Sequence, residues 1–131
     1  TLSIWKHLRF YAMLKGVNKE VQKKHLTDLL SSVELISIKK KAVKRLSGGQ
    51  KRRLSIAVAL CSKPAVILLD EPSSGLDPAT RRQLWNVILA SRTGRAMILT
   101  THAMEEAESL ASRVAIMASG KLRCIGTIDH L

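Results

Sequence analysis

The spacing of apolar positions changes along the chain and divides it into a helical part and a mixed part. Apolar residues recur every three or four positions over residues 4–15, 18–33 and 47–62, which predicts three helices joined by short connections. The basic stretch 37–45 is predicted to be a linker. The side chains expected to face inward are Ile4, Trp5, Leu8, Tyr11, Ala12 and Leu14 on the first helix, Val21, Leu26, Leu29, Leu30 and Val33 on the second, and Leu54, Ala57, Val58 and Cys61 on the third.

Beyond residue 62 the pattern alternates between short apolar runs and helical stretches. Such an order predicts an α/β fold, in which a helical subdomain over residues 1–62 is followed by part of a parallel-sheet core over residues 63–131. Thr127 is predicted to cap a last helix that Leu131 cuts off. The expected elements of the second part are buried parallel strands at 65–69 and 96–100, helices at 80–91 and 104–112, and a hairpin formed by 114–117 and 122–125.

Two adjacent glycines follow a hydroxyl residue where the third predicted helix begins, in Leu46-Ser47-Gly48-Gly49-Gln50. Free backbone N–H groups and the positive end of the helix dipole meet at such a terminus, and glycine lets an anion approach the backbone closely. Ser47 can add a hydroxyl hydrogen bond. Alone, this motif would favour a glycine-rich turn with a capping serine; with the carboxylates that follow, it indicates a phosphate-binding turn.

Paired carboxylates, Asp70 and Glu71, stand where the first apolar run ends. A carboxylate there can hold Mg²⁺ through water, and its neighbour can polarise an attacking water. His102 follows the second apolar run at the corresponding place, and open α/β sheets bind ligands at the carboxyl ends of their strands. The alternative interpretation is that Asp70 and Glu71 are exposed carboxylates at a strand end and that His102 is a structural histidine. Taken with the glycine turn, the three residues indicate a nucleoside triphosphate site.

Charge is unevenly distributed. Residues 1–53 carry fourteen Lys and Arg against three acidic residues, a net charge of +11, out of +12 for the chain. Such asymmetry can mark a nucleic-acid or anionic-lipid surface, but it is more often a solvated helical face. Because the lysine runs lack interleaved aromatics, we expect no nucleic-acid partner. Cys61 and Cys124 show no metal-ligand spacing, and no apolar stretch approaches the eighteen or so residues of a spanning helix.

These motifs together resemble those of the ATP-binding cassette (ABC) ATPases. Residues 46–50 resemble the signature motif of that family, residues 66–71 the Walker B strand, and His102 the switch histidine. Several further strings, among them residues 8–12 and 104–108, are similar to the A subfamily of ABC transporters, which are mostly lipid-linked exporters. The D-loop of the family is matched by Ser74, Gly75, Leu76 and Asp77.

The resemblance implies a P-loop NTPase (ABC ATPase) fold and a role for each matched residue. Ser47, Gly48, Gly49 and Gln50 would contact the γ-phosphate of an ATP held by a second nucleotide-binding domain, arranged head to tail with this one. Asp70 would position Mg²⁺, Glu71 would orient water, and His102 would contact the γ-phosphate. Asp77 would help couple the two sites. The other implied partners are transmembrane domains of the same transporter, at the cytoplasmic face of a membrane.

The sequence departs from the family in one respect, because it contains no G-x-x-x-x-G-K-[ST]. The phosphate-cradling Walker A segment and the Q-loop are expected to lie before Thr1, so the chain looks like the C-terminal two-thirds of a nucleotide-binding domain. We expect the chain alone to be inactive. Two alternatives stay open: a soluble ABC ATPase acting on nucleic acid or ribosomes, and a catalytically silent truncated product.

Overall fold

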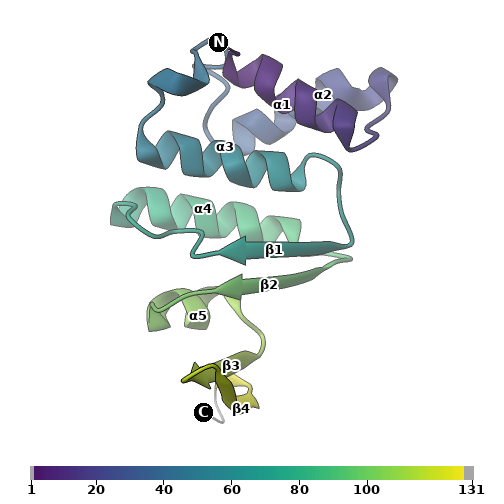
Figure 1. Ribbon diagram of the computed structural model, residues 1–131. Helices are drawn as coiled ribbons and strands as arrows, with labels where there is room; N and C mark the ends of the chain where they lie inside the picture. Colours follow the sequence, from purple (N-terminus) through teal and green to yellow (C-terminus); the bar gives the residue numbers. More distant parts are fainter. Residues whose placement is uncertain (1, 129–131) are drawn as a thin grey trace. The chain divides into compact units, whose positions relative to one another are not determined.

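The computed structural model describes residues 2–128 (Figure 1). The helix predicted to follow Thr127 lies almost entirely outside the described residues. By their internal contacts the residues divide into two compact units, Thr1–Thr100 and Thr101–Leu131, and each is described by itself.

Three helices open the first unit: α1 (Ile4–Leu14), α2 (Lys19–Ser32) and α3 (Gly48–Leu60). A side chain caps each one, because Ser3, Asn18 and Ser47 accept hydrogen bonds from backbone N–H groups of the first turn. Gly16, with φ +75°, follows the end of α1. The three predicted helices are therefore confirmed. The stretch predicted as a linker contains a 3₁₀ turn, η1 (Val43–Arg45).

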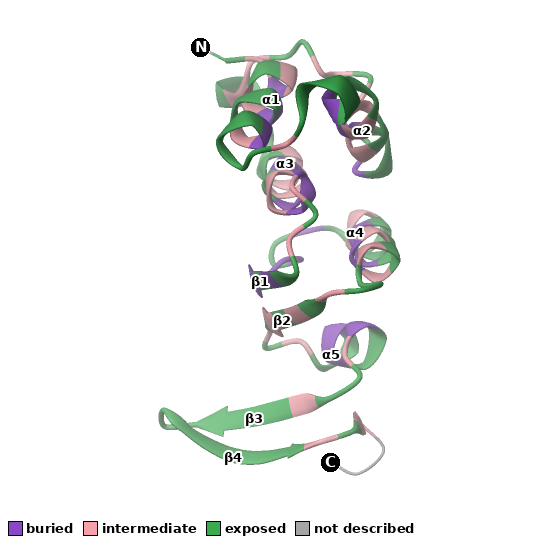
Figure 2. Cartoon of the chain, turned by 90° about the vertical axis from the view of Figure 1, so that its right-hand side faces the viewer, coloured by how far each residue is buried: buried purple, intermediate pink, exposed green. Residues whose placement is uncertain are grey.

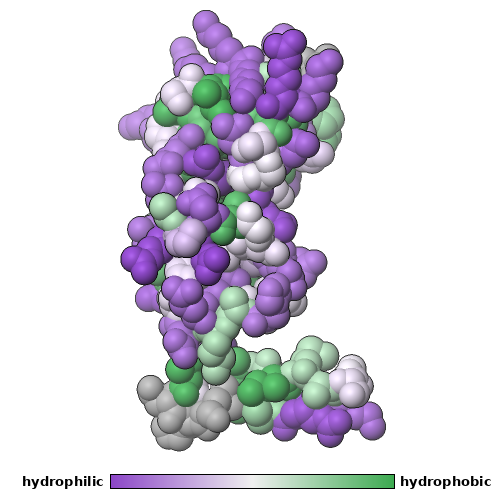
Figure 3. All heavy atoms as spheres, turned by 90° about the vertical axis from the view of Figure 1, so that its left-hand side faces the viewer, coloured by the Kyte–Doolittle hydropathy of each residue, from purple (hydrophilic) through white to green (hydrophobic). Residues whose placement is uncertain are grey.

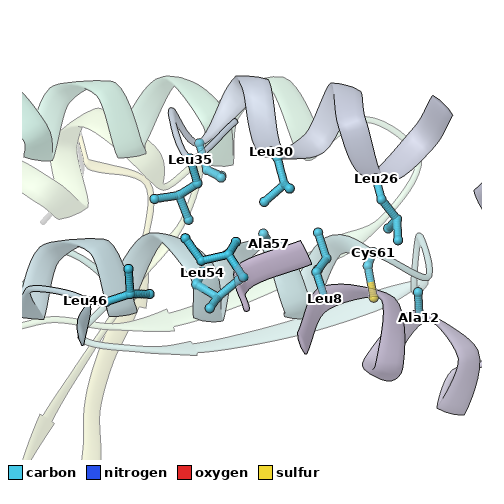
Figure 4. Packing of buried hydrophobic residues seen from close by; sticks show 11 residues of the cluster. Leu8, Ala12, Leu26, Leu30, Leu35, Leu46, Leu54, Ala57 and Cys61 are labelled. Carbon is cyan, nitrogen blue, oxygen red and sulfur yellow. The ribbon is translucent and has the colours of Figure 1, made fainter. Parts of the chain in front are cut away.

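The first three helices pack around one apolar cluster (Figure 4). Two inward predictions were wrong: Val21 is 60% and Leu14 is 67% exposed. Val21 and Leu26 are five residues apart, which places them well over 90° apart around a helix, so they cannot share one narrow face. The buried cluster consists of Ile4, Leu8 and Ala12 of α1, Leu26, Leu30, Val33 and Leu35 of α2 and the turn after it, and Leu46, Leu54, Ala57 and Cys61 of α3 and its ends.

Helix α4 (Pro78–Ser91) and strands β1 (Val66–Asp70) and β2 (Ala96–Thr100) complete the first unit. The strands pair in parallel, from Val66 opposite Ala96 to Asp70 opposite Thr100, as predicted. Their expected burial on both faces was wrong. Ile67 and Leu69 are buried, whereas Leu68 is 72% and Ile98 61% exposed. Figure 2 shows α4 on one side of the strands and no other described element of this unit on the opposite side.

The second unit contains α5 (Met104–Leu110) and a hairpin of β3 (Val114–Ala118) and β4 (Lys121–Gly126). The strands are antiparallel, with a register irregularity between Ile116 and Met117. Both elements agree with the sequence prediction. The hairpin is exposed along nearly all of its length, as its green colour in Figure 2 shows.

Candidate active site

The glycine turn at residues 47–50 forms the first turn of α3. Ser47 and Gln50 make a capping box: Ser47 Oγ accepts a hydrogen bond from the Gln50 amide at 3.2 Å, and Gln50 Oε1 accepts one from the Ser47 amide at 3.2 Å. The first bond of the regular helix runs from Lys51 N to Ser47 O, at 2.9 Å. The amides of Gly48 and Gly49 precede that bond, so they have no acceptor within the helix and point out of its N-terminus.

Gly49 lies directly against the loop that follows β1. A Cβ atom built on Gly49 would stand 3.2 Å from Leu76 Cδ2, whereas one built on Gly48 would meet nothing within 4 Å. Leu76 is 8% exposed, so its side chain has limited room to move away. The two turns that sequence analysis assigned to one site therefore lie side by side, 27 residues apart in the chain, and a side chain at position 49 would press on Leu76.

The two carboxylates stand at the end of the parallel sheet. Asp70 is the last residue of β1 and pairs in register with Thr100, whose hydroxyl donates a hydrogen bond to Asp70 Oδ1. The amide of Glu71 bonds to Thr100 O at 3.0 Å. Thr100 therefore holds both acidic residues in place. Sequence analysis missed it; the signal that could have found it is its position as the last residue of the second strand, opposite Asp70.

Glu71 itself adopts a left-handed backbone conformation, with φ 43°. A side chain with a Cβ atom seldom occupies this region, and it costs about 1–2 kcal/mol relative to ordinary conformations. Among residues 2–128, three other residues besides glycine have a positive φ, namely Glu34, Lys63 and Ser119. Of the four, only Glu71 lies at the carboxyl end of a parallel strand, where this conformation turns the backbone out of the strand. Its side chain is half-buried.

Residues 71–77 form the loop between β1 and α4. Pro72 and Ser73 are buried, Ser74 and Gly75 are exposed, and Asp77 caps α4 by accepting a hydrogen bond from Thr80 N at 3.0 Å. Hydrogen bonds from the side chain and the backbone of Thr80 hold the pKa of the Asp77 carboxyl below its ordinary value. Asp77 therefore has a structural role in starting α4, whatever further role it has.

His102 belongs to the second unit and is exposed, two residues after Thr100. The structure thus brings Asp70, Glu71 and Thr100 together, and separately Gly49 and Leu76, all within the first unit. His102 stands two residues beyond the end of β2, after the second apolar run as the sequence predicted. In that turn Thr101 Oγ1 accepts a hydrogen bond from the Ala103 amide at 3.0 Å.

The acidic residues could hold a magnesium ion only if water and phosphate oxygens supplied its other ligands, as they do in nucleotide enzymes. Among residues 2–128 no group of three or more His, Cys, Asp or Glu could hold a metal by itself. Mg²⁺ commonly takes one or two carboxylates and fills its other positions with water and phosphate oxygens. Asp70 fits this pattern, because it is exposed and Thr100 orients it through one oxygen.

A family model described as ABC transporter matches residues 2–74, more than half of the sequence. The chain belongs to the ABC transporter family, and it carries part of an ATP-binding domain of that family. The incomplete P-loop NTPase fold expected from the motifs is confirmed by a solved ATP binding subunit of an ABC transporter. That structure superposes with a TM-score of 0.87 at 28% identity, over 98% of this chain and 54% of the solved one.

Curated relatives place the similarity in the A subfamily. Over 130 residues the chain is 50% identical to ABC transporter A family member 11 of Arabidopsis thaliana, and over 131 residues it is 46% identical to ATP-binding cassette sub-family A member 2 of Homo sapiens. Each match covers 99% of this chain but only 14% and 5% of the relative. The chain therefore spans a small part of the length of these proteins. Within residues 2–128, no helix has the length and apolar character to cross a bilayer.

Proposed function

We propose that this chain is the signature-bearing part of a nucleotide-binding domain that hydrolyses ATP to drive transport across a membrane. The observation that carries the proposal is the contact of Gly49 with Leu76, beside a strand that ends in Asp70 and Glu71. This arrangement puts free amides, a D-loop and two carboxylates on one unit. Similarity to A-subfamily members along 99% of the chain supports the assignment to transport.

Each residue has a role in this proposal that its geometry permits. The hydroxyl of Ser47 and the amides of Gly48 and Gly49 would contact the γ-phosphate of an ATP held by the second nucleotide-binding domain. The Ser47 oxygen already accepts from Gln50, so its hydroxyl hydrogen stays available for donation. The role of Gln50 would be to hold this turn in its capped form through its side-chain oxygen.

The carboxylates would act on the nucleotide of the domain that carries them. Asp70, oriented by Thr100, would hold Mg²⁺ through water, and the ion would supply charge neutralisation on the phosphates. Glu71 would orient a water for in-line attack and accept its proton, and His102 would contact the γ-phosphate on the same side. Asp77 would couple the two sites through the loop that touches Gly49.

The proposal also extends to architecture and partners. Residues 1–62 would form the helical signature subdomain, which agrees with an apolar cluster that runs from Ile4 to Cys61, and residues 63–131 would form the C-terminal part of the ATPase core. A second nucleotide-binding domain and transmembrane domains would complete the transporter. The part that this chain forms would lie at the cytoplasmic face of the membrane. Lipids are the proposed substrate class, because the sequence strings are most similar to the A subfamily.

The decisive variant is Glu71→Gln, tested in a longer protein that carries these residues together with a Walker A segment. We expect ATP turnover to fall about a hundredfold or more, because the water loses its proton acceptor, while ATP binding persists. Glu108→Gln, at an exposed position of α5, is the matched control and should leave turnover unchanged. Equal loss of ATP binding and turnover in Glu71→Gln would show that Glu71 has a structural role instead.

A second experiment separates the alternatives. The chain of 131 residues should show no ATP turnover above background, because no Walker A lysine holds the nucleotide in place. Turnover that Glu71→Gln abolishes in this chain would contradict the expectation. In the longer protein, ATP-dependent movement of lipid between membrane leaflets would support transport, and stimulation of turnover by polynucleotides or ribosomes would support the soluble alternative.

A further inference from the structure

Helix α1 carries a second set of apolar side chains, which faces away from the core. Its inward residues Ile4, Leu8 and Ala12 are fully buried, whereas Phe10 is 48%, Met13 52% and Leu14 67% exposed. Lys6 and Arg9 are exposed as well. These five residues follow the spacing i, i+3, i+4, i+7 and i+8, so they share one face of the helix. We call Lys6, Arg9, Phe10, Met13 and Leu14 the outer stripe.

The chain folds three more lysines against the start of this helix. The Ile4 amide donates to Lys41 O and the Trp5 amide donates to Lys39 O, each at 3.0 Å. Lys39 Nζ lies 5.9 Å from the centre of the Trp5 ring, and both Lys40 and Lys41 are exposed. Residues 39–41 are therefore fixed beside the first turn of α1, although 30 residues separate them in sequence. Figure 3 shows long hydrophilic side chains crowded at this end of the first unit, with hydrophobic ones between them.

The segments that form this surface carry no carboxylate of their own. The sequence contains no Asp or Glu before Glu20 and none between Glu34 and Asp70, so α1, residues 35–46 and α3 have none. Glu34 is already paired with Arg53, at 3.0 Å. The outer stripe, Lys40 and Lys41 thus form a surface of exposed cations beside exposed apolar side chains, next to the half-buried Lys39. The acidic residues of the adjoining helix α2 are Glu20 and Asp28, so the surface is strongly basic overall.

We propose that this surface docks on an anionic lipid bilayer. The ammonium groups would lie among lipid headgroups, and Phe10, Met13 and Leu14 would enter the boundary between headgroups and acyl chains, as interfacial amphipathic helices do. Clustered lysines near an anionic leaflet each add attraction through its surface potential. The inference does not depend on ATP binding or hydrolysis by this chain, and it goes beyond the proposed function.

A bilayer fits this surface better than a protein or a nucleic acid does. The cavity of about 240 Å³ beside α1 is lined by other residues, among them His7, Tyr11 and Lys51, and contains none of the outer stripe. A partner helix seated in that cavity would therefore not be held by the outer stripe. Together the outer stripe and residues 39–41 carry five cations, and four of these are lysines. Lysines act as point charges and lack the fixed fork with which arginine recognises single carboxylates or phosphates. Phe10 is the one aromatic residue of the surface, which is too few for base stacking along a strand.

The test is flotation of the 131-residue chain with lipid vesicles, which keeps bound protein apart from any aggregate. We expect the chain to float with vesicles of phosphatidylcholine that contain phosphatidylserine and to stay behind with phosphatidylcholine alone. Binding should weaken as salt is added, because the attraction of exposed charges is screened. This salt dependence needs no variant, so the proposal can fail on the unmodified chain.

Two sets of variants locate the surface. The triple substitution Lys6→Gln/Arg9→Gln/Lys40→Gln should weaken binding at least about tenfold. The matched control Lys19→Gln/Lys23→Gln/Lys24→Gln removes the same charge from three exposed positions of α2. It should weaken binding less than about threefold. Phe10→Ser/Met13→Ser should abolish the part of the binding that survives high salt, whereas Val21→Ser, at a similarly exposed position on α2, should not.

Three outcomes would overturn the proposal. The first is equal binding to neutral and anionic vesicles. The second is equal loss in the two triple variants, which would mean that net charge alone drives binding. The third is retention on polynucleotide, sensitive to the same outer-stripe variants, without binding to vesicles of either composition; the surface would then be a nucleic-acid interface.

Discussion

The helical cluster and the two-stranded sheet of the first unit differ sharply in how completely they are packed. In the helical cluster, Leu8, Leu26 and Leu30 are fully buried among three helices. In the sheet, one face of β1 is buried and the other is open, with Leu68 72% exposed. Apolar burial is the main stabilising contribution in a folded domain, so most of the stability of this unit should reside in the helices.

The helices that contribute most of the stability are therefore a different region from the end of the sheet, where the acidic residues of the candidate site lie. Asp70, Glu71 and Thr100 lie at the end of the incompletely covered sheet, whereas the signature turn begins α3, which contacts α1, α2 and α4. Functional residues commonly stand on the less stable parts of a structure, because a site needs exposed polar groups. The predictions that follow test this separation, from the largest effect to the smallest.

The largest effect should come from the helical cluster. Leu30→Ala removes a fully buried side chain and should lower the free energy of unfolding by about 2–5 kcal/mol. Leu68→Ala makes the same chemical change on the open face of β1 and should cost less than about 0.5 kcal/mol. Urea unfolding followed by circular dichroism measures both. Similar losses in the two variants would mean that the open face is covered and that the two regions do not differ.

Relief of backbone strain should raise the free energy of unfolding, whereas the leucine substitutions lower it. Lys63, just after α3, and Glu71 both have positive φ, 49° and 43°. Glycine tolerates this region without steric cost, so Lys63→Gly and Glu71→Gly should each raise the free energy of unfolding by about 0.5–1 kcal/mol. Gln83→Gly, at an exposed helical position in α4, is the control and should lower it by about 1 kcal/mol. If Glu71→Gly destabilises the chain, the contacts of its carboxylate outweigh the strain.

A smaller effect should distinguish the two signature glycines. Gly48→Ala has open space and should stabilise α3 by up to about 0.5 kcal/mol, whereas Gly49→Ala must displace Leu76 and should gain less or lose stability. When Leu76→Ala is also present, Gly49→Ala should become as favourable for stability as Gly48→Ala. A double-mutant cycle in urea measures this coupling. Additive effects in that cycle would show that the two turns do not interact.

The smallest effect should be a dependence on pH from the cap of α4. The pKa of the Asp77 carboxyl is lowered from its ordinary value of 3.8, so its contribution is complete above that value and is lost as the pH falls through the lower pKa of the folded state. Asp77→Asn keeps an oxygen that can cap the helix but cannot titrate. The variant should therefore show a weaker fall in urea midpoint as the pH is lowered below 3.8, whereas an unchanged fall would assign the dependence to other carboxylates.

Sequence patterns predicted the elements well because their signals are local. Ser47 and Gln50 stand three residues apart, as a capping box requires, and the hairpin turn is marked by Ser119 and Gly120. The residues of the candidate site were also found locally, since Asp70 and Glu71 end an apolar run. Burial was predicted less well. An apolar run such as residues 66–69 shows that a strand tolerates burial on both faces, but it does not say which neighbours cover them.

Contacts between distant segments needed the structure. The register of β1 and β2 decides that Thr100 faces Asp70, and no single-sequence pattern specifies that register to within one residue. The contact of Gly49 with Leu76 has the same origin, because it depends on how α3 lies against the loop after β1. The hydrogen bonds between residues 39–41 and α1 were likewise missed, since the stretch 37–45 was predicted only to be a linker.

The parallel pairing of β1 with β2 has a consequence for the order of assembly. Each pair in this register joins residues 30 positions apart, from Val66 with Ala96 to Asp70 with Thr100, whereas the bonds within α1, α2 and α3 close between near neighbours. Closing a long loop costs entropy before any contact is gained, so pairing of this kind forms later than helices do. The carboxylates acquire their Thr100 partner only when that loop closes. We expect a chain emerging from the ribosome to hold its helices well before it holds its acidic residues in place.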